Sequence, residues 1–381
     1  MTVGGPLADL RVVELTGLAP APFGCMVLAD LGAEVVRVDR AGPGGDGLLA
    51  PSGVLDRSRR SIAIDLKTDE GREVLLRLVD EADVLVEGYR PGVAERLGIG
   101  PEACLERNPR LVYARMTGWG QDGPLAPRAG HDINYIALSG ALEPIGTADG
   151  KPVPPLNLLG DFGGGGLLMA MGVLAALHER SSSGRGQVVD AAMVDGSALL
   201  TAFIHGMHHA GLWQQERGHN IFDGTAAFYD TYACADGRFV AVGCVEPHFY
   251  AELVERLGLA DTDLPHQFDF DAADKLKAHF AEVFATRPRD EWAAVFADSD
   301  ACVTPVLSPF EAHEHPHNAA RSTFTVVGGI RQPAPAPRFS RTPASDPRPP
   351  RRPGTDTDEI LGELGLDAAA VTRLRASGAV E

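Results

Sequence analysis

The sequence places a histidine and an aspartate where they could move a proton. His131 follows Gly130 in the run Ala-Gly-His-Asp, and Asp161 lies two residues before four consecutive glycines. A third candidate, Glu246, follows an apolar run, 239–245, that is typical of a strand. An imidazole and two carboxylates are suited to general acid–base catalysis next to a carbonyl group.

The residues after Asp161 predict a helix. A glycine run and then the apolar stretch 167–177 put this carboxylate at the point where the helix begins. The first N–H groups of a helix lack partners within it and stabilise negative charge. We therefore expect an oxyanion site at the backbone N–H of Asp161. Taken alone, Asp161 also fits the role of a helix N-cap, and His131 fits a structural role.

The elements that must position these residues alternate between strand and helix over the first 200 residues. This βαβ pattern predicts a doubly wound, mostly parallel α/β sheet with helices on both faces. The first βα turn, 16–24, lacks the G-x-G-x-x-G fingerprint, which argues against NAD or FAD binding. Strands are expected over 10–15, 34–39, 61–65, 83–87, 111–116 and 187–193, with helices such as 21–31 and 68–82 between them.

A different pattern begins near Tyr229. Residues 229–243 read as two strands joined at an Asp236-Gly237 turn. Helices are expected over 249–257, 272–285, 289–296 and in the tail after Thr355. We therefore predict a large α/β domain over 1–200, a linker helix over 201–225, a small α+β domain over 226–325, and a proline- and arginine-rich connector over 331–354.

Composition points to a cytoplasmic enzyme. The 381 residues carry a formal net charge of −18, which weighs against nucleic acid as a partner. No apolar stretch reaches the roughly 20 residues needed to span a membrane, and the first residues do not resemble a signal peptide. The five cysteines show no Cys-x-x-Cys spacing and are expected to be reduced thiols, not disulfide or zinc ligands: Cys25, Cys104, Cys234, Cys244 and Cys302.

Two local clusters have an open role. The run His313-Glu-His-Pro-His317 could bind a metal, but Pro316 favours a solvated loop, and no metal site is expected. A group of basic residues could attract a polyanionic small molecule such as coenzyme A, or could be ordinary solvated side chains. Its members are Arg37, Arg40, Arg57, Arg59, Arg60 and Lys67.

Four segments together resemble the α-methylacyl-CoA racemases of the family III CoA-transferase superfamily. The resemblance runs from Leu7 to about Pro343. It implies that 331–381 complete the large domain and that two chains form an interlocked homodimer with the site between subunits. The segments are Tyr113-Ala-Arg-Met-Thr-Gly-Trp-Gly120, Gly130-His-Asp-Ile-Asn-Tyr135, Pro154-Pro-Leu-Asn-Leu-Leu-Gly-Asp-Phe-Gly-Gly-Gly165 and Val188-Val-Asp-Ala-Ala-Met-Val-Asp-Gly196.

The resemblance also implies a reaction: the interconversion of R and S 2-methylacyl-CoA thioesters through an enolate. His131 and Asp161 would be the two bases, one removing the α-proton and the other returning a proton on the opposite face. Glu246 would orient the imidazole, and Asp132 could assist the same histidine. No metal or redox cofactor is needed, since coenzyme A is part of the substrate.

Coenzyme A contacts are implied by the same motifs. Because Ile64 differs from the residue in close racemases, only a backbone contact would survive there. The expected contacts are Arg40 at the adenine and phosphate end, Ile64, Asp65, Leu66 and Lys67 at the nucleotide, Gly88, Tyr89, Arg90 and Arg96 at the pantetheine and phosphates, and Gly130, Asp132, Ile133, Asn134 and Tyr135 along the thioester.

Two other functions stay open. In transferases of this superfamily the aspartate that matches Asp161 is a nucleophile, which forms an aspartyl-CoA thioester. Those enzymes usually carry another residue where this chain has His131, so the histidine favours a racemase. A protein that binds coenzyme A without catalysis is the other alternative. The acyl group is open among branched 2-methyl fatty acyl, sterol side-chain and aryl-propionyl thioesters.

Overall fold

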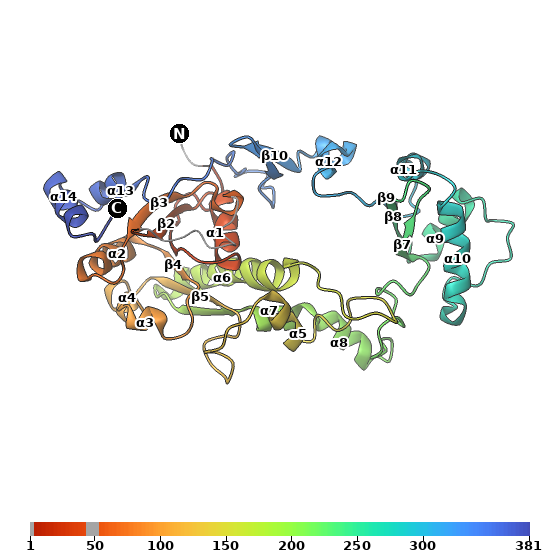
Figure 1. Ribbon diagram of the computed structural model, residues 1–381, viewed down its shortest axis with the longest axis horizontal. Helices are drawn as coiled ribbons and strands as arrows, with labels where there is room; N and C mark the ends of the chain where they lie inside the picture. Colours follow the sequence, from red (N-terminus) through yellow and green to blue (C-terminus); the bar gives the residue numbers. More distant parts are fainter. Residues whose placement is uncertain (1–3, 43–52) are drawn as a thin grey trace. The chain divides into compact units, whose positions relative to one another are not determined.

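The computed structural model describes residues 4–42 and 53–381, which divide into two compact units. Among the described residues, the first unit contains 4–42, 53–139, 155–200 and 322–381. The second unit contains 140–154 and 201–321. The chain therefore leaves the first unit and returns to it, and Figure 1 shows the strands of the first unit together with the C-terminal helices.

A six-stranded sheet, parallel throughout its ladders, forms the centre of the first unit, in the order β3-β2-β1-β4-β5-β6. Its strands read as short apolar runs because both faces are buried, which is typical of parallel sheets. The strands agree with the predicted ones to within one or two residues. They are β1 (Arg11–Leu15), β2 (Glu34–Arg40), β3 (Arg60–Ile64), β4 (Val84–Glu87), β5 (Val112–Thr117) and β6 (Val188–Ala192).

Helices cover both faces of this sheet, as predicted for a doubly wound fold. On one face, α1 (Pro20–Asp30) and α6 (Leu168–Ser183) pack through Leu28 and Val173 against Val12 and Val84. On the other face the core joins Val13 and Ile62 to the helices α2 (Asp69–Glu81), α3 (Val93–Arg96), α4 (Pro101–Arg107) and α13 (Thr357–Glu363). Thr68 caps α2 by accepting the Gly71 N–H.

The C-terminal segment completes the sheet at its β3 edge, as the resemblance implied. Asp356 Oδ2 accepts the Ser61 N–H at 2.9 Å, and Val380 pairs with Ile64 in an antiparallel bridge. The helices α13 and α14 (Ala368–Ala376) lie between these two contacts along the chain. A hairpin of β10 (Phe324–Val327) and β11 (Ile330–Pro333) precedes the segment, and 334–356 form coil and turns.

The helix that carries Asp161 begins earlier than predicted and winds differently. A π-helix over Leu158–Leu167 leads directly into α6. Its glycines permit close packing: a Cβ at Gly164 would lie 2.7 Å from Ser197 N in α7 (Met193–Leu200), and one at Gly166 would lie 2.5 Å from Pro20 O. The joint helix, Leu158–Ser183, is long and apolar enough to span a membrane, contrary to the expectation from sequence. Its glycine face and Met169, Ala170 and Val173 instead pack in the core of the first unit.

The second unit is built around an antiparallel sheet of β7 (Tyr229–Ala233), β8 (Phe239–Gly243) and β9 (Val303–Pro305). The predicted Asp236-Gly237 turn joins the first two strands, and Gly237 has φ +74°. Helices α9 (Pro247–Arg256), α10 (Ala273–Phe284) and α11 (Arg289–Phe296) enclose an aromatic core with Phe280 and Trp292. The short helix α12 (Pro316–Ala320) follows.

The linker helix predicted over 201–225 is much shorter in the structure. Helix α8 covers Ala202–His209, and residues 210–228 form turns and coil. Gly211 adopts φ +73°, a left-handed conformation that ends a helix readily. Arg217 then donates to the carbonyl oxygens of Glu143 and Gly150, so these turns pack on residues 140–154 of the same unit.

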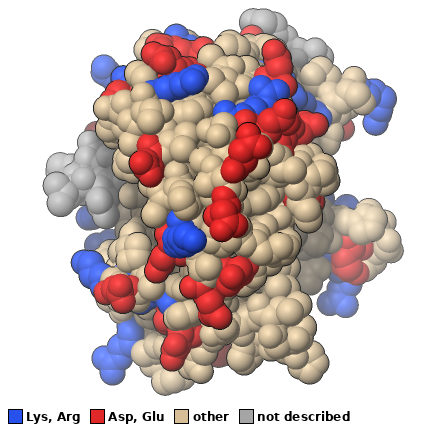
Figure 2. Space-filling model, turned by 90° about the vertical axis from the view of Figure 1, so that its right-hand side faces the viewer, with Lys and Arg blue, Asp and Glu red and all other residues tan. Residues whose placement is uncertain are grey.

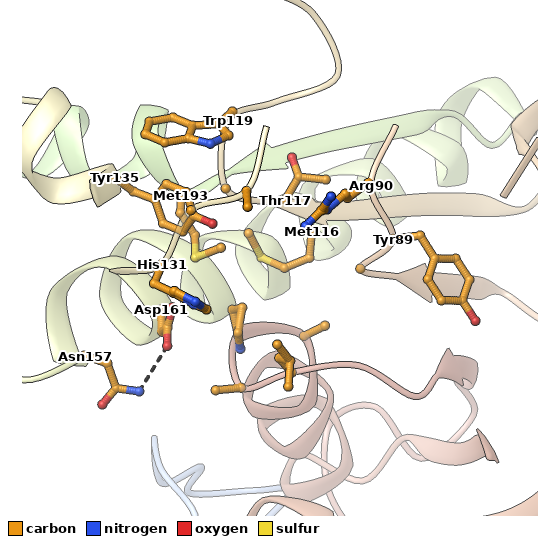
Figure 3. Close-up of a pocket in the computed structure, with 18 of the residues that line it drawn as sticks. Tyr89, Arg90, Met116, Thr117, Trp119, His131, Tyr135, Asn157, Asp161 and Met193 are labelled. Atoms are coloured by element: carbon orange, nitrogen blue, oxygen red, sulfur yellow. Dashed lines mark hydrogen bonds between the residues drawn. The ribbon is translucent and has the colours of Figure 1, made fainter. Parts of the chain in front are cut away.

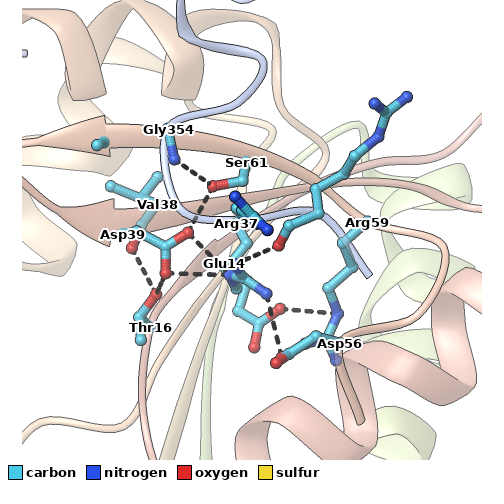
Figure 4. A network of polar contacts seen from close by, with 12 residues as sticks. Glu14, Thr16, Arg37, Val38, Asp39, Asp56, Arg59, Ser61 and Gly354 are labelled. Carbon is cyan, nitrogen blue, oxygen red and sulfur yellow. Dashed lines mark hydrogen bonds and ion pairs between the residues drawn. The ribbon is translucent and has the colours of Figure 1, made fainter. Parts of the chain in front are cut away.

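Three arginines of the predicted basic cluster are buried in ion pairs and form no surface patch. Arg59 pairs with Glu14 at 3.1 Å and with Asp56 at 2.9 Å, and Arg37 pairs with Asp39 at 2.9 Å (Figure 4). Arg57 pairs with Asp30. Glu14 lies on β1 and Asp30 on α1, far from their arginines in the sequence, so the spacing gave no sign of these two pairs. Asp39 and Asp56 are local partners, two residues after Arg37 and three residues before Arg59. On the face drawn in Figure 2, acidic and basic side chains are interspersed.

Candidate active site

A cavity of about 530 Å³ opens at the carboxyl ends of β1, β4, β5 and β6. Strands β1 and β4 are neighbours in the sheet, and from this pair the chain continues outward in opposite directions. In doubly wound sheets, such a switch point leaves a crevice at the carboxyl ends of the strands, where ligands bind. The parallel sheet thus positions the site.

His131 and Asp161 both line this cavity, from different elements. His131 is the N-cap of α5 (Asp132–Leu138), and its backbone N–H donates to Asn134 Oδ1 at 3.0 Å. Asp161 lies in the π-helix. Figure 3 shows the imidazole of His131 and the carboxylate of Asp161 side by side at the cavity. The structure therefore brings together the two residues that the sequence singled out.

The surroundings of Asp161 act on its protonation in opposite directions. Burial raises the pKa of the carboxyl most strongly. Asn157 Nδ2 donates to Asp161 Oδ2 at 3.0 Å and lowers the pKa, because the bond favours the charged form. The negative charge of Asp132 raises it, and His131 lowers it. The net result is a carboxyl pKa above its usual range, which suits a group that both takes and gives a proton.

One expectation for this region was wrong. Asp132 Oδ2 accepts the Asp161 N–H at 2.7 Å, so the N–H expected to hold the enolate oxygen already has a partner. The same contact directs Asp132 Oδ2 to the π-helix, and assistance of His131 by Asp132 stays a prediction. The physical reason is that an N–H at a helix start lacks an acceptor in its own helix, and a carboxylate from α5 supplies one.

Glycines keep the walls of the cavity close. A Cβ at Gly118 would lie 2.1 Å from the ring of Tyr135, and one at Gly130 would lie 2.9 Å from Trp119. Tyr135 and Trp119 contact each other edge to face, with ring centroids 4.7 Å apart. Apolar side chains complete the lining: Leu18, Met116, Phe162 and Met193. Such a surface can receive an acyl chain beside the two ionisable groups.

The predicted coenzyme A residues fall into two groups. Five of them line the cavity: Gly88, Tyr89 and Arg90 after β4, Gly130 just before α5, and Tyr135 within α5. Arg40 ends β2 and Lys67 follows β3, and both are exposed at the same edge of the sheet but outside the cavity lining. Asp65 and Leu66 also follow β3 outside the lining and are half-buried. Arg96 is exposed at the end of α3.

Three other predicted contacts are constrained by their surroundings. Ile64 is 1% exposed in the sheet core, and its carbonyl oxygen accepts the Ala41 N–H, so its side chain is not available to a ligand. Asn134 is engaged with the His131 backbone. Ile133 is 44% exposed on α5, outside the cavity lining.

Glu246 belongs to the second unit, where it is exposed as the N-cap of α9. The cavity that holds His131 and Asp161 is formed by residues of the first unit alone. Within that unit, sequence reasoning missed Asn157. A signal existed, since an amide four residues before a candidate base falls on the same side of a helix.

Comparison with known proteins places the chain among its relatives. The model of CoA-transferase family III matches residues 7–358. The chain belongs to this family. It is 50% identical to the alpha-methylacyl-CoA racemase of Mus musculus and 47% identical to that of Homo sapiens, each over 378 residues that cover 98% of this chain and 97% of the relative. A solved CAIB/BAIF family protein from Brucella suis superposes with a TM-score of 0.82 at 26% identity, covering 95% of this chain and 100% of that one.

Proposed function

We propose that this family III member is a 2-methylacyl-CoA racemase that uses His131 and Asp161 as its two bases. The observation that carries the proposal is the presence of both groups in one cavity, on different elements. Similarity to the mouse and human racemases supports it. A single base would suffice to exchange an α-proton, but inversion needs a second group on the opposite face of the enolate.

The proposed steps follow from this arrangement. One group takes the α-proton, the electron pair moves into the thioester carbonyl to give the enolate, and the other group returns a proton to the opposite face. The roles reverse for the other enantiomer. Burial raises the pKa of Asp161, so this carboxylate accepts a proton more readily than a solvated one. The thioester would lie along Gly130 and Tyr135, with Arg90 near the pantetheine.

We also propose that the enzyme is an obligate homodimer and that Glu246 of one chain orients His131 of the other. The separation of Glu246 from the cavity residues into a different unit motivates this step. Analytical ultracentrifugation of the active enzyme should show a dimer. A fully active monomer would contradict the proposal.

The competing reaction is CoA transfer with Asp161 as nucleophile. Incubation of one enantiomer of 2-methylacyl-CoA in heavy water should give deuterium at the α-carbon and both configurations, without an acceptor acid. Replacement of His131 with alanine should reduce racemisation by roughly 10² or more. An acyl-enzyme trapped by hydroxylamine, with CoA transfer to an added free acid, would favour the transferase.

The proposed phosphate contact of Arg40 has a separate test. Because that contact is equal in the ground and transition states, Arg40→Ala should weaken apparent acyl-CoA affinity and leave the turnover number nearly unchanged. Initial rates over a range of substrate concentrations measure both quantities. A collapse of turnover at unchanged affinity would show that Arg40 has another role.

A further inference from the structure

Asp132 is a buried carboxylate next to both proposed bases. It is 7% exposed and directly follows His131 at the start of α5. Its Oδ2 accepts the Asp161 N–H at 2.7 Å, whereas its Oδ1 is buried without a hydrogen-bond partner. A buried charged group with an unused oxygen is costly for a protein, so a function that requires it is expected.

The contact joins the two elements that carry the bases. His131 is fixed to α5 through Asn134, and the N–H of Asp161 belongs to the first turn of the π-helix. The hydrogen bond from the Asp161 N–H to Asp132 therefore connects α5, which has His131 as its N-cap, to the backbone of Asp161. Because the acceptor is charged, the bond is stronger than one between neutral groups.

The contact between Asp132 and the Asp161 N–H depends on the glycine that precedes Asp161. Gly160 is buried, and a Cβ there would lie 2.5 Å from Asp132 Oδ2. Any side chain at this position would push the carboxylate away from the Asp161 N–H. From α1 and α7, the side chains nearest to the π-helix glycines are those of Pro20, Phe23, Met193, Ser197 and Leu200, which carry no charge.

We infer that Asp132 is a positioning residue, which holds the two proton-transfer groups at a fixed separation across the substrate. The inference rests on the proposed racemase function. Inversion requires both groups at the α-carbon at once, whereas proton exchange without inversion requires one. Loss of the hydrogen bond between Asp161 and Asp132 should therefore reduce inversion more than exchange. Misplacement of a catalytic group by about 1 Å can reduce the rate about 10²-fold.

Asp132 also acts on Asp161 through its charge. Within residues 4–42 and 53–381, the titratable groups that interact with Asp161 are Asp132 and Tyr135 of α5 and His131, the N-cap of that helix. The negative charge of Asp132 raises the pKa of Asp161, so its removal should lower that pKa. Where Asp161 is the base, the acidic limb of the pH–rate profile should then move to lower pH.

Two variants of the full-length enzyme separate these effects. Asp132→Ala removes the acceptor and should lower the ratio of inversion to α-deuterium exchange by at least tenfold, toward the hundredfold that misplacement can cost. Asp132→Asn keeps an oxygen that can accept the Asp161 N–H, so it should restore the wild-type ratio while moving the acidic limb to lower pH. The exposed Asp122→Asn serves as the matched control and should change neither quantity.

The outcomes are distinct from those of the proposed function. Absence of α-deuterium uptake by the wild type would reject the racemase itself. With uptake present, an Asp132→Ala variant that keeps the wild-type ratio overturns the positioning role. An Asp132→Asn variant with an unmoved pH profile overturns the charge effect on Asp161. If the alanine variant does not fold, Gly160→Ala displaces the same carboxylate and should lower the ratio, and an unchanged ratio in that variant would overturn the positioning role.

Discussion

At the scale of single residues, Asp161 is tuned by two neighbours with opposite effects. Asn157 donates to its carboxylate and lowers the pKa, and Asp132 places a negative charge nearby and raises it. Burial adds the largest upward effect. The pKa of Asp161 should therefore shift measurably when either Asn157 or Asp132 is replaced.

Replacement of Asn157 with leucine removes the donor but keeps a side chain of similar size. The pKa of Asp161 should rise further, so the acidic limb of the pH–rate profile should move to higher pH for the enantiomer that uses Asp161 as base. This direction is opposite to that expected for Asp132→Asn. Initial rates measured across the pH range test the sign, and a shift to lower pH would contradict our account of the hydrogen bond.

At the scale of elements, the π-helix depends on glycine where it meets α5. Gly160→Ala should destabilise the protein by about 1–3 kcal/mol, because its Cβ would overlap Asp132 Oδ2. The control is Gly163→Ala in the same helix, where the nearest atom, Leu158 O, would be 3.3 Å away. Urea unfolding gives both values. Equal effects of the two substitutions would show that backbone flexibility, not the carboxylate contact, sets the cost.

The buried ion pairs and hydrogen bonds of Figure 4 join β1, β2, β3 and the residues around Asp56. Arg59→Met should cost roughly 3–5 kcal/mol, because it leaves Glu14 buried without its partner. Burial raises the pKa of Glu14 and Arg59 lowers it, so the variant's Glu14 should protonate more readily. The loss of stability should therefore shrink as the pH falls.

Unfolding at mildly acidic and mildly alkaline pH measures this dependence. Arg77→Met is the matched control, since Arg77 and Glu73 form an exposed pair at 3.6 Å whose loss should cost at most about 1 kcal/mol. A cost for Arg59→Met that stays constant with pH would indicate that the guanidinium acts through packing instead of charge.

Local patterns predicted the elements, but not the contacts between them. The apolar run 34–39 became β2, and the Asp236-Gly237 turn formed the hairpin, because both depend on neighbouring residues. The pairing of Arg59 with Glu14 and the bond between Asp132 and Asp161 depend on which elements meet in space. His131 and Asp161 were identified through whole motifs. The π-helix could not be predicted, because a run of glycines shows no hydrophobic periodicity.

At the scale of the whole molecule, the first unit depends on residues from both ends of the chain. Asp356→Ala should destabilise it by about 1–3 kcal/mol, because the buried Ser61 N–H loses its acceptor. The control is Asp358→Ala, two residues after Asp356. It removes an exposed ion pair with Arg375 and should cost at most about 1 kcal/mol. Chemical unfolding distinguishes them, and a cost for Asp356→Ala no greater than that of the control would contradict a structural role for the β3 contact.

The covering of β3 by the C-terminal segment has a consequence for synthesis on the ribosome. Ser61 and Asp356 are 295 residues apart, so translation leaves the β3 edge open for on the order of 15–60 s after the strand emerges. An open strand edge can pair with another nascent chain. The entire second unit is made during this interval. Translation of the last 26 residues, and not formation of the parallel sheet, therefore sets the moment when the first unit closes.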